Sequence, residues 1–347
     1  MSFAIQPRRP YSPKPPRPLV AIQPQPARPA PPRPPYPSLV TSRPRSPYRP
    51  IVQFIAGYLL GLFGGAVLIV AALWLFPPPR TNILLLGLDR RPDEKTFVSR
   101  TDTMILMTIN SAQRTSGSQS GPYVGMLSIP RDLFLTLPDG SQGRVNTAHF
   151  FAETEAPGSG PEAAMQTVRS NFGVDVPHYV RIDLVGFVKI VDAVGGIEID
   201  VPKPLIDNEY PTYAYGVTTV EFAAGPQHMD GERALAYARI RHGSSDFQRA
   251  ERQQLVIQAL MARLMRPSAW GRLPALLGAI GNSVDTDLTP IELARLAPTV
   301  LRVGPSGLDR RVIEGDMVQP YTTEGGGAVQ LPVWEKINPV LIEMFGQ

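Results

Sequence analysis

A run of 26 residues without a charged side chain, Ile51 to Phe76, limits what this chain can be more than any other feature. A helix rises about 1.5 Å per residue, so the run is longer than the roughly 30 Å hydrocarbon core of a membrane. The apolar core of a secretory signal peptide would be only about 7–15 residues long. Three prolines follow this run, where a signal peptide would have a cleavage site of small residues. We therefore predict one membrane-spanning helix over residues 51–76.

The two flanks of this run differ in charge. Residues 1–50 hold nine of the 34 Lys and Arg residues, 17 of the 39 prolines and no acidic residue, whereas Arg80 is the basic residue just after the run. Lys and Arg are enriched on the cytoplasmic side of membrane helices. We therefore predict a cytoplasmic N-terminus and an extracytoplasmic domain over residues 80–347. The Pro/Arg-rich tail, residues 1–50, is too poor in apolar residues to form a core, so we predict that it is disordered.

Composition excludes several partners and chemistries. Without the tail, the chain has 25 Lys and Arg residues against 30 Asp and Glu residues, which disfavours a nucleic-acid partner. The absence of cysteine excludes disulfides, thiolate nucleophiles and cysteine-bound metals. The sequence has no motif of a phosphate loop, a dinucleotide-binding fold, a zinc protease or a serine hydrolase. Within the span, Gly57, Gly61 and Gly65 have the spacing that lets two helices approach, which allows a weak homodimer.

Short apolar runs alternate with helical patterns over residues 80–347. The predicted strands are Asn82–Leu88, Thr103–Asn110, Tyr123–Ile129, His178–Asp183, Ile197–Val201 and Arg311–Glu314. The predicted helices are Pro161–Phe172, Leu184–Val194, Gly231–Ala238, Phe247–Met265, Ile291–Leu301 and Pro332–Phe345. Polar stretches at Ser111–Pro122 and Glu155–Pro161 are typical of loops. We therefore predict one α/β domain in which helices cover a sheet.

Charged residues gather at the ends of the predicted strands. Asp89 follows the first strand, Arg100 and Asp102 precede the apolar part of the second, and Arg131 follows the third. Open α/β sheets bind ligands at strand ends, so these residues form a candidate site. Two alternatives remain at this point. The aspartates could instead shape turns, and Arg131 could form a surface ion pair with Asp132.

The helix after Ser245 gives the strongest indication of a binding site. Ser245 and Gln248 fit a capping box, which fixes the register of the helix. In that register Arg249 and Gln253 begin the core-facing stripe. A guanidinium that faces inward needs an anionic partner, so an anion is expected near the start of this helix.

Two further arginines, Arg239 and Arg241, precede this helix. If their segment is extended, both side chains point to one side and repel each other unless an anion lies between them. Guanidinium groups bind phosphate oxygens through paired hydrogen bonds, so these residues favour a pyrophosphate site. Alternatively, Asp246 neutralises Arg249 locally, or the arginines form surface ion pairs with neighbouring glutamates.

Sequence blocks between residues 82 and 265 resemble the LytR-CpsA-Psr family in content and order. They are LLLGLDRR, SRTDTMILMTIN, MLSIPRDLFLTLPDG with GRVNTAH, VPHYVRIDLVGFVKIVDAVGGIEIDVP, and GPQHMDGERALAYARIRHGSSDFQRAERQQ. The resemblance implies an α/β domain whose central mixed β-sheet is flanked by helices on both faces and preceded by one transmembrane helix. It also implies a cell-membrane enzyme that transfers a glycopolymer from a polyprenyl-pyrophosphate carrier to peptidoglycan.

The resemblance also implies a role for each site residue. Asp89 and Asp102 would bind Mg²⁺. Catalytic roles are implied for Arg100, Arg131, Arg239, Arg241 and Asp246, and pyrophosphate binding for Arg100, Arg131, Arg239, Arg241, Arg249 and Gln253. Two departures affect lesser phosphate contacts and the fit of the acceptor: Arg144 stands where the family usually has lysine, and the short segment His242–Ser245 replaces a commonly longer loop. Two other functions stay open, a regulatory protein that binds the lipid without turnover and a pyrophosphatase that hydrolyses it.

Overall fold

The computed structural model describes residues 48–76, 78–90, 96–111, 121–212, 216–241 and 245–346 of the chain. The predicted disorder of the tail therefore lies outside the described residues except at its last three positions. The loops predicted at Ser111–Pro122 and His242–Ser245 lie mostly outside them as well. The chain divides into two units, Met1–Leu59 and Leu60–Gln347, and each is described by itself.

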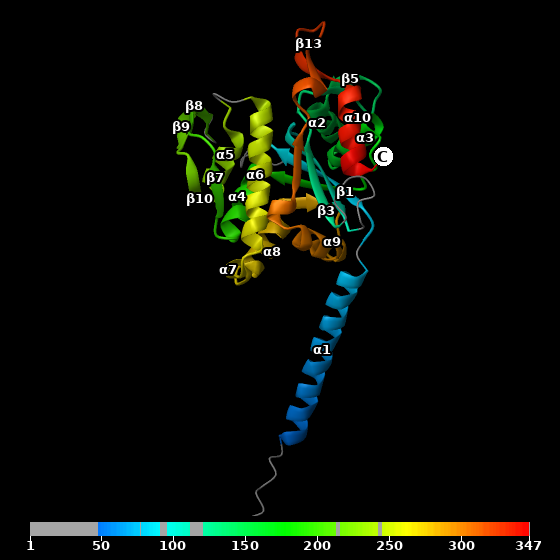
Figure 1. The fold of residues 1–347 in the computed structure, drawn as a ribbon, viewed down its shortest axis with the longest axis vertical. Helices are drawn as coiled ribbons and strands as arrows, with labels where there is room; N and C mark the ends of the chain where they lie inside the picture. Colours follow the sequence, from blue (N-terminus) through cyan, green and yellow to red (C-terminus); the bar gives the residue numbers. More distant parts are fainter. Residues whose placement is uncertain are drawn as a thin grey trace, which may run out of the picture. The chain divides into compact units, whose positions relative to one another are not determined.

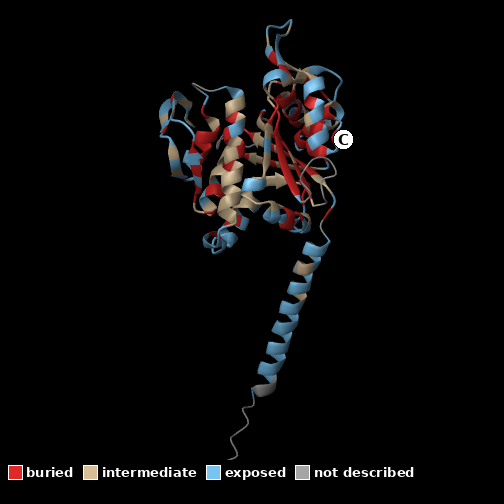
Figure 2. Ribbon diagram, viewed as in Figure 1, coloured by how far each residue is buried: buried red, intermediate tan, exposed pale blue. Residues whose placement is uncertain are grey.

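The predicted span forms one helix, α1 (Arg49–Leu75). By length and composition it can cross a membrane, and its apolar side chains are exposed along most of its length (Figure 2). A Cβ atom added at Gly57, Gly61 or Gly65 would meet nothing within 4 Å. These glycines are therefore open to a second helix, and the weak homodimer stays a prediction.

A six-stranded sheet forms the centre of the second unit (Figure 1). Its strands, in spatial order, are β11 (Val284–Thr286), β6 (His178–Asp183), β1 (Thr81–Leu88), β2 (Thr101–Asn110), β3 (Tyr123–Ser128) and β12 (Asp309–Val312). The pairs β1 with β6 and β3 with β12 are parallel, and the other three neighbouring pairs are antiparallel. The sheet is therefore mixed, as predicted.

Helices cover both faces of this sheet because successive strand side chains point to opposite sides. On one face, Leu84 and Leu86 of β1 share a buried cluster with α3 (Gly160–Phe172) and α10 (Trp334–Phe345). On the other face, Ile83 shares a cluster with α9 (Pro290–Val303). The predicted two-faced architecture is confirmed.

A further buried cluster lies beyond the sheet edge formed by β6 and β11. It joins α4 (Leu184–Ala193), β7 (Ile197–Val201), α5 (Gly231–Arg239) and α6 (Asp246–Leu264). Figure 2 shows buried residues both in the central strands and in this helical region. The packing of α5 and α6 fixes the segment that carries the predicted arginines.

Sequence patterns missed several short elements. These are the helices α2 (Val145–Glu155), α7 (Pro267–Trp270) and α8 (Leu273–Ser283), the 3-10 turns η1 (Pro305–Gly307) and η2 (Gly315–Met317), strand β11 of the central sheet, strand β10 (Gly225–Met229), which pairs with β7, and the hairpins β4–β5 (Phe134–Thr136, Gln142–Arg144), β8–β9 (Leu205–Pro211, Val217–Phe222) and β13–β14 (Val318–Thr322, Ala328–Pro332). Helix α2 was hidden because its buried face includes polar residues, among them His149 and Glu153. Strand β12 begins two residues before the predicted Arg311 and ends two residues early, and α10 begins at Trp334 and not at Pro332.

Helix α5 packs so closely on α4 that Gly231 leaves no room for a side chain. We expect Gly231→Ala to lower the free energy of unfolding by about 1–3 kcal/mol. The new Cβ would lie 2.8 Å from Cα of Val188 and closer still to its carbonyl oxygen, and backbone atoms cannot rotate away. Urea denaturation of the full-length protein in detergent measures the effect. Gly278→Ala in α8 is the control, since its Cβ meets nothing within 4 Å, and equal stability of the two variants would contradict this expectation.

Candidate active site

Three strand ends meet at one edge of the sheet. Leu88 pairs with Thr101 of β2 and with Asp183 of β6, so Asp89 lies beside the start of β2 and the end of β6. The antiparallel pairing of β2 with β3 brings the segment after β3, which carries Arg131, to the same edge. The residues predicted at strand ends therefore do come together.

Carboxylates and guanidinium groups form a network at this edge. Asp102 accepts from Nη1 of Arg131 at 3.1 Å and from Nη2 of Arg241 at 3.0 Å. Nε of Arg131 also lies 3.3 Å from Oδ2 of Asp246. Burial acts to lower the pKa of Arg131, but the charges of Asp102 and Asp246 outweigh it and raise that pKa. Among the described residues Arg131 thus pairs with Asp102 and Asp246, and not with Asp132.

Arg249 is the most buried charged group of this network. Its side chain is 7% exposed, and Nη1 lies 3.0 Å from Oδ1 of Asp246. The geometry is not that of a hydrogen bond, so this buried nitrogen has no hydrogen-bond partner among the described residues. Burial, followed by the charge of Arg131, lowers the pKa of Arg249. Local neutralisation by Asp246, left open from the sequence, is thus observed, but Asp246 is shared with Arg131.

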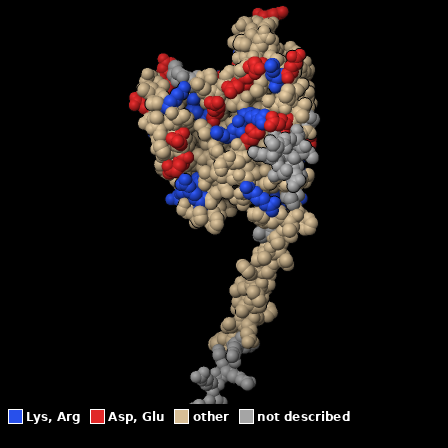
Figure 3. All heavy atoms as spheres, in the orientation of Figure 1, with Lys and Arg blue, Asp and Glu red and all other residues tan. Residues whose placement is uncertain are grey.

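Arg239 and Arg241 reach the site from the end of a helix and not from an extended segment. The sequence-based assumption was wrong because α5 continues through Arg239, and the chain turns only at Ile240. Nη2 of Arg239 lies 3.0 Å from Oδ1 of Asp89. Together with Arg131 and Arg249, four guanidinium groups therefore converge on the carboxylates of Asp89, Asp102 and Asp246. Figure 3 shows blue and red side chains next to each other on the face drawn there.

Two residues of β8 position these arginines, and no sequence pattern indicated either of them. The carboxylate of Asp207, 1% exposed, accepts from the backbone N–H of Arg241 at 3.1 Å. The guanidinium carbon of Arg239 lies 5.7 Å from the centre of the Tyr210 ring. Because β8 pairs with β9 in a separate hairpin, its pattern does not reveal that two of its side chains reach these arginines.

Two of the predicted site residues, Arg100 and Gln253, form no ion pair in the described part of the chain. Arg100 is exposed, and its guanidinium carbon lies 6.0 Å from the centre of the Phe150 ring. Gln253 is only half-buried, whereas the neighbouring Arg252 and Gln254 are buried. The predicted stripe therefore placed Arg249 correctly but missed the two residues on either side of Gln253.

Arg252 and Gln254 hold α6 in place from inside. Nε of Arg252 donates to the carbonyl of Tyr237 at 3.0 Å, which fixes α6 to the last turn of α5. The amide of Gln254 donates to Oγ of Ser128 and to the carbonyl of Arg311, both at 2.8 Å. The capping box of Ser245 and Gln248 is present as predicted. These bonds set where α6 presents Asp246 and Arg249.

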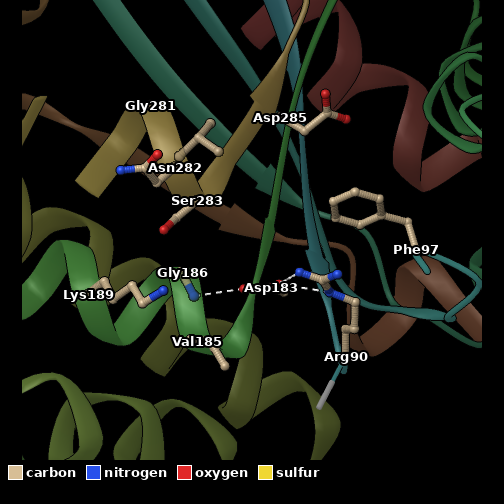
Figure 4. A pocket seen from close by; sticks show the side chains of 11 residues that line it. Arg90, Phe97, Asp183, Val185, Gly186, Lys189, Gly281, Asn282, Ser283 and Asp285 are labelled. Carbon is tan, nitrogen blue, oxygen red and sulfur yellow. Dashed lines mark hydrogen bonds and ion pairs between the residues drawn. The ribbon is translucent and has the colours of Figure 1, made fainter. Parts of the chain in front are cut away.

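A polar pocket of about 380 Å³ adjoins Asp89 through the next residue, Arg90 (Figure 4). Nε of Arg90 donates to Oδ2 of Asp183 at 2.8 Å. Asp183 also accepts from the backbone N–H of Gly186 at 2.7 Å and so caps α4. The ring of Phe97 lies beneath Arg90, 4.4 Å from its guanidinium carbon. The pocket thus combines charges of both signs, and two of them, Arg90 and Asp183, pair with each other.

A buried ion cluster supports this edge of the sheet from within. Nη1 of Arg181 lies 3.1 Å from Oε2 of Glu153, and both side chains are 4% exposed. Arg181 also contacts Oδ2 of Asp285 at 2.7 Å and Nε2 of His149 at 3.1 Å. A guanidinium only donates, so Nε2 of His149 accepts and its Nδ1–H donates to the carbonyl of Ser99 at 3.0 Å. This arrangement requires a neutral imidazole.

We expect the free energy of unfolding to fall as pH drops below 6.5, the ordinary pKa of His149. Burial, followed by the charge of Arg181, lowers the pKa of His149 in the folded state, so the unfolded chain takes up a proton first. Burial acts to raise the pKa of Glu153, but hydrogen bonds from Gly158 and Gly160 and the charge of Arg181 outweigh it and lower that pKa. The stabilisation from Glu153 is therefore lost below its ordinary pKa of 4.5. Urea denaturation between about pH 8 and pH 5 measures the slope. A slope in His149→Gln that equals the wild-type slope would contradict the assignment.

The chain is similar in sequence to proteins of one known family. A family model described as the LytR_cpsA_psr family matches residues 79–331, which is most of the chain. The chain belongs to the LytR-CpsA-Psr family. It is 33% identical over 217 residues to TagU of Oceanobacillus iheyensis, named polyisoprenyl-teichoic acid–peptidoglycan teichoic acid transferase, covering 62% of this chain and 61% of that protein. It is 28% identical over 219 residues to TagU of Enterococcus faecalis, covering 62% and 64%. The chain thus spans about three fifths of these relatives.

Solved structures show the same fold. The crystal structure of Bacillus subtilis TagV has a TM-score of 0.59 at 24% identity and covers 77% of this chain and 98% of that one. A structure described as TagT bound to LIIa-WTA has a TM-score of 0.58 at 21% identity and covers 78% and 92%. At these identities the likeness establishes the LytR-CpsA-Psr fold.

Proposed function

We propose that the protein transfers an envelope glycopolymer from a polyprenyl-pyrophosphate carrier to peptidoglycan. The observation that carries the proposal is the convergence of four guanidinium groups at one sheet edge, where Nη1 of buried Arg249 forms no hydrogen bond among the described residues. Such a site binds an anion with several oxygens, and a pyrophosphate is one. The names of the TagU relatives support the polymer and the acceptor.

Chemically, the reaction exchanges one phosphorus–oxygen bond for another. A hydroxyl oxygen of the acceptor attacks the phosphorus next to the polymer, the bond to the bridging oxygen breaks, and polyprenyl phosphate leaves with the bonding electrons. The hydroxyl proton passes to one of the site carboxylates. Negative charge grows on the departing phosphate, and Arg131, Arg239 and Arg241 stabilise it there.

Mg²⁺ fits this donor set together with a pyrophosphate. Among the described residues, no three His, Cys, Asp or Glu side chains gather into a cation site. Asp89 and Asp102 supply two carboxylates, and Mg²⁺ commonly binds one or two carboxylates plus substrate phosphates. Both oxygens of Asp102 contact arginines, so the phosphate would have to draw those arginines towards itself. When bound, the ion supplies further charge neutralisation on the phosphate oxygens.

One reconstitution tests transfer against its alternatives. Full-length protein in detergent micelles is incubated with a radiolabelled polyprenyl-pyrophosphate-linked glycan and peptidoglycan, with Mg²⁺ or with a chelator. We expect label on peptidoglycan and release of polyprenyl phosphate, both lost with the chelator. Free labelled glycan phosphate would instead indicate a pyrophosphatase. Binding without any product would indicate a regulatory lipid-binding protein.

The proposed function requires that residues 80–347 lie outside the cytoplasm, because peptidoglycan does. We expect a reporter joined after Gln347 to be extracytoplasmic, because nine basic residues precede the uncharged run that starts at Ile51. Protease accessibility in intact spheroplasts measures this, and a reporter joined before Met1 should be protected. Protection of the Gln347 fusion would defeat the proposed localisation and the function with it.

A further inference from the structure

A groove of about 790 Å³ lies between the hairpins β4–β5 and β13–β14. Both hairpins are at the upper end of the domain in Figure 1. Side chains that line it include Tyr321, Trp334, Gln142, Thr323 and Glu324. The groove combines aromatic rings with amide, hydroxyl and carboxylate groups.

Several of these side chains have unused binding capacity. Tyr321 is 46% exposed although it is a large aromatic residue. In the part of the chain that is described, the side chains of Tyr321, Gln142 and Glu324 form no hydrogen bond or ion pair. By contrast, one edge of the Trp334 ring packs on Phe172, with ring centres 5.6 Å apart. An aromatic ring with an apolar face and a polar edge suits a ligand that has both, as a pyranose ring does.

Charge separates this groove from the arginine site. Among the described residues that line it, Glu324 alone carries a charge. A phosphate-rich polymer or a pyrophosphate would meet no cation there and would be repelled by that carboxylate. A neutral chain of N-acetylated amino sugars meets no such penalty, and its hydroxyl and amide groups match the free polar groups of the groove.

The groove is connected directly to Arg131. The backbone N–H of Gln330 in β14 donates to the carbonyl of Asp132 at 3.0 Å, and Leu133 forms a parallel bridge with Gln330. Nη2 of Arg144 donates to the carbonyl of Ala328 at 2.8 Å. Phe134, which lines the groove, is three residues from Arg131, and a turn at Arg131 and Asp132 lies between them.

From these observations we infer that the groove binds the glycan strand of peptidoglycan and presents one of its hydroxyl groups to the arginine site. This inference rests on the proposed transfer function and names the part of the molecule that selects the acceptor. Tyr321 stacks on a sugar ring, and Gln142 and Glu324 bind its polar groups.

Binding of an uncharged oligomer of N-acetylglucosamine to the full-length protein in micelles tests the inference. We expect Tyr321→Ala to weaken this binding about tenfold, because the ring face is lost. Binding of inorganic pyrophosphate should not change. Trp270→Ala is the matched control, since Trp270 is 59% exposed on α7 and lies outside the groove, and it should bind both probes like the wild type.

Transfer kinetics separate this inference from the proposed function. We expect Tyr321→Ala to raise the KM for peptidoglycan about tenfold and to leave the KM for the lipid-linked donor unchanged. Wild-type transfer together with unchanged oligosaccharide binding and unchanged KM in Tyr321→Ala would overturn the inference alone. A raised KM for the donor alone would also overturn it, because the groove would then hold the donor glycan. Oligosaccharide binding that depends on Tyr321, without any transfer, would leave a glycan site standing and defeat the proposed function.

Discussion

Replacing Arg241 with alanine is expected to lower kcat/KM for the lipid-linked donor about 100-fold or more. A charge-assisted hydrogen bond contributes roughly 1.5–3 kcal/mol, and a bidentate pair on phosphate contributes more. The side chain is 50% exposed, so its removal leaves no cavity in the core. It also contacts Asp102, which holds Arg131, so two guanidinium groups lose their arrangement together. Single-turnover kinetics with the labelled donor measure the loss.

Two control variants show whether geometry or mere charge is lost. Arg241→Lys keeps the charge but loses the planar fork, so we expect it to recover only part of the activity. Arg310→Ala removes an exposed arginine of β12 outside the network and should leave kcat/KM unchanged. Full activity of Arg241→Ala would show that the network consists of surface ion pairs without a catalytic role. The regulatory alternative would then be the favoured function.

Replacing Arg181 with methionine is expected to lower the free energy of unfolding by about 3–5 kcal/mol. Arg181 and Glu153 are both 4% exposed, so the variant leaves a buried carboxylate without its cation. The imidazole of His149 loses its donor in the same change. Urea denaturation at neutral pH measures the difference in the free energy of unfolding. We expect Arg181→Met to lose more stability than any other variant proposed for this protein.

The size of that loss depends on burial, and two variants test this. Adding Glu153→Gln to Arg181→Met removes the uncompensated charge and should recover part of the stability. Lys336→Met breaks an ion pair with Asp316 at 3.3 Å whose partners are 55% and 73% exposed, so it should change stability by less than about 1 kcal/mol. Equal losses in Arg181→Met and Lys336→Met would show that burial of the Arg181 cluster contributes nothing.

Local patterns in the sequence predicted those features that depend on neighbours along the chain. The uncharged run at residues 51–76 predicted α1, and the capping box at Ser245 fixed the start of α6. Alternating apolar segments predicted an α/β sheet, and strand ends predicted Asp89, Asp102 and Arg131 as site residues. Strands repeat their apolar residues every two positions and helices about every 3.6, and a capping box involves four consecutive residues. One short segment of sequence is therefore enough to predict each of these features.

Only the tertiary structure decided which of these groups pair with one another. Asp102 meets Arg241, which is 139 residues later in the chain, and Asp89 meets Arg239, 150 residues later. Asp207 and Tyr210 approach the same arginines from a hairpin with no distinctive pattern. The sequence indicates only that Arg181 belongs to a strand. The structure shows that it forms ion pairs with Glu153 and Asp285. Such pairings depend on how the sheet and the helices pack against each other. The spacing of apolar residues within one segment does not show which distant segment it will contact.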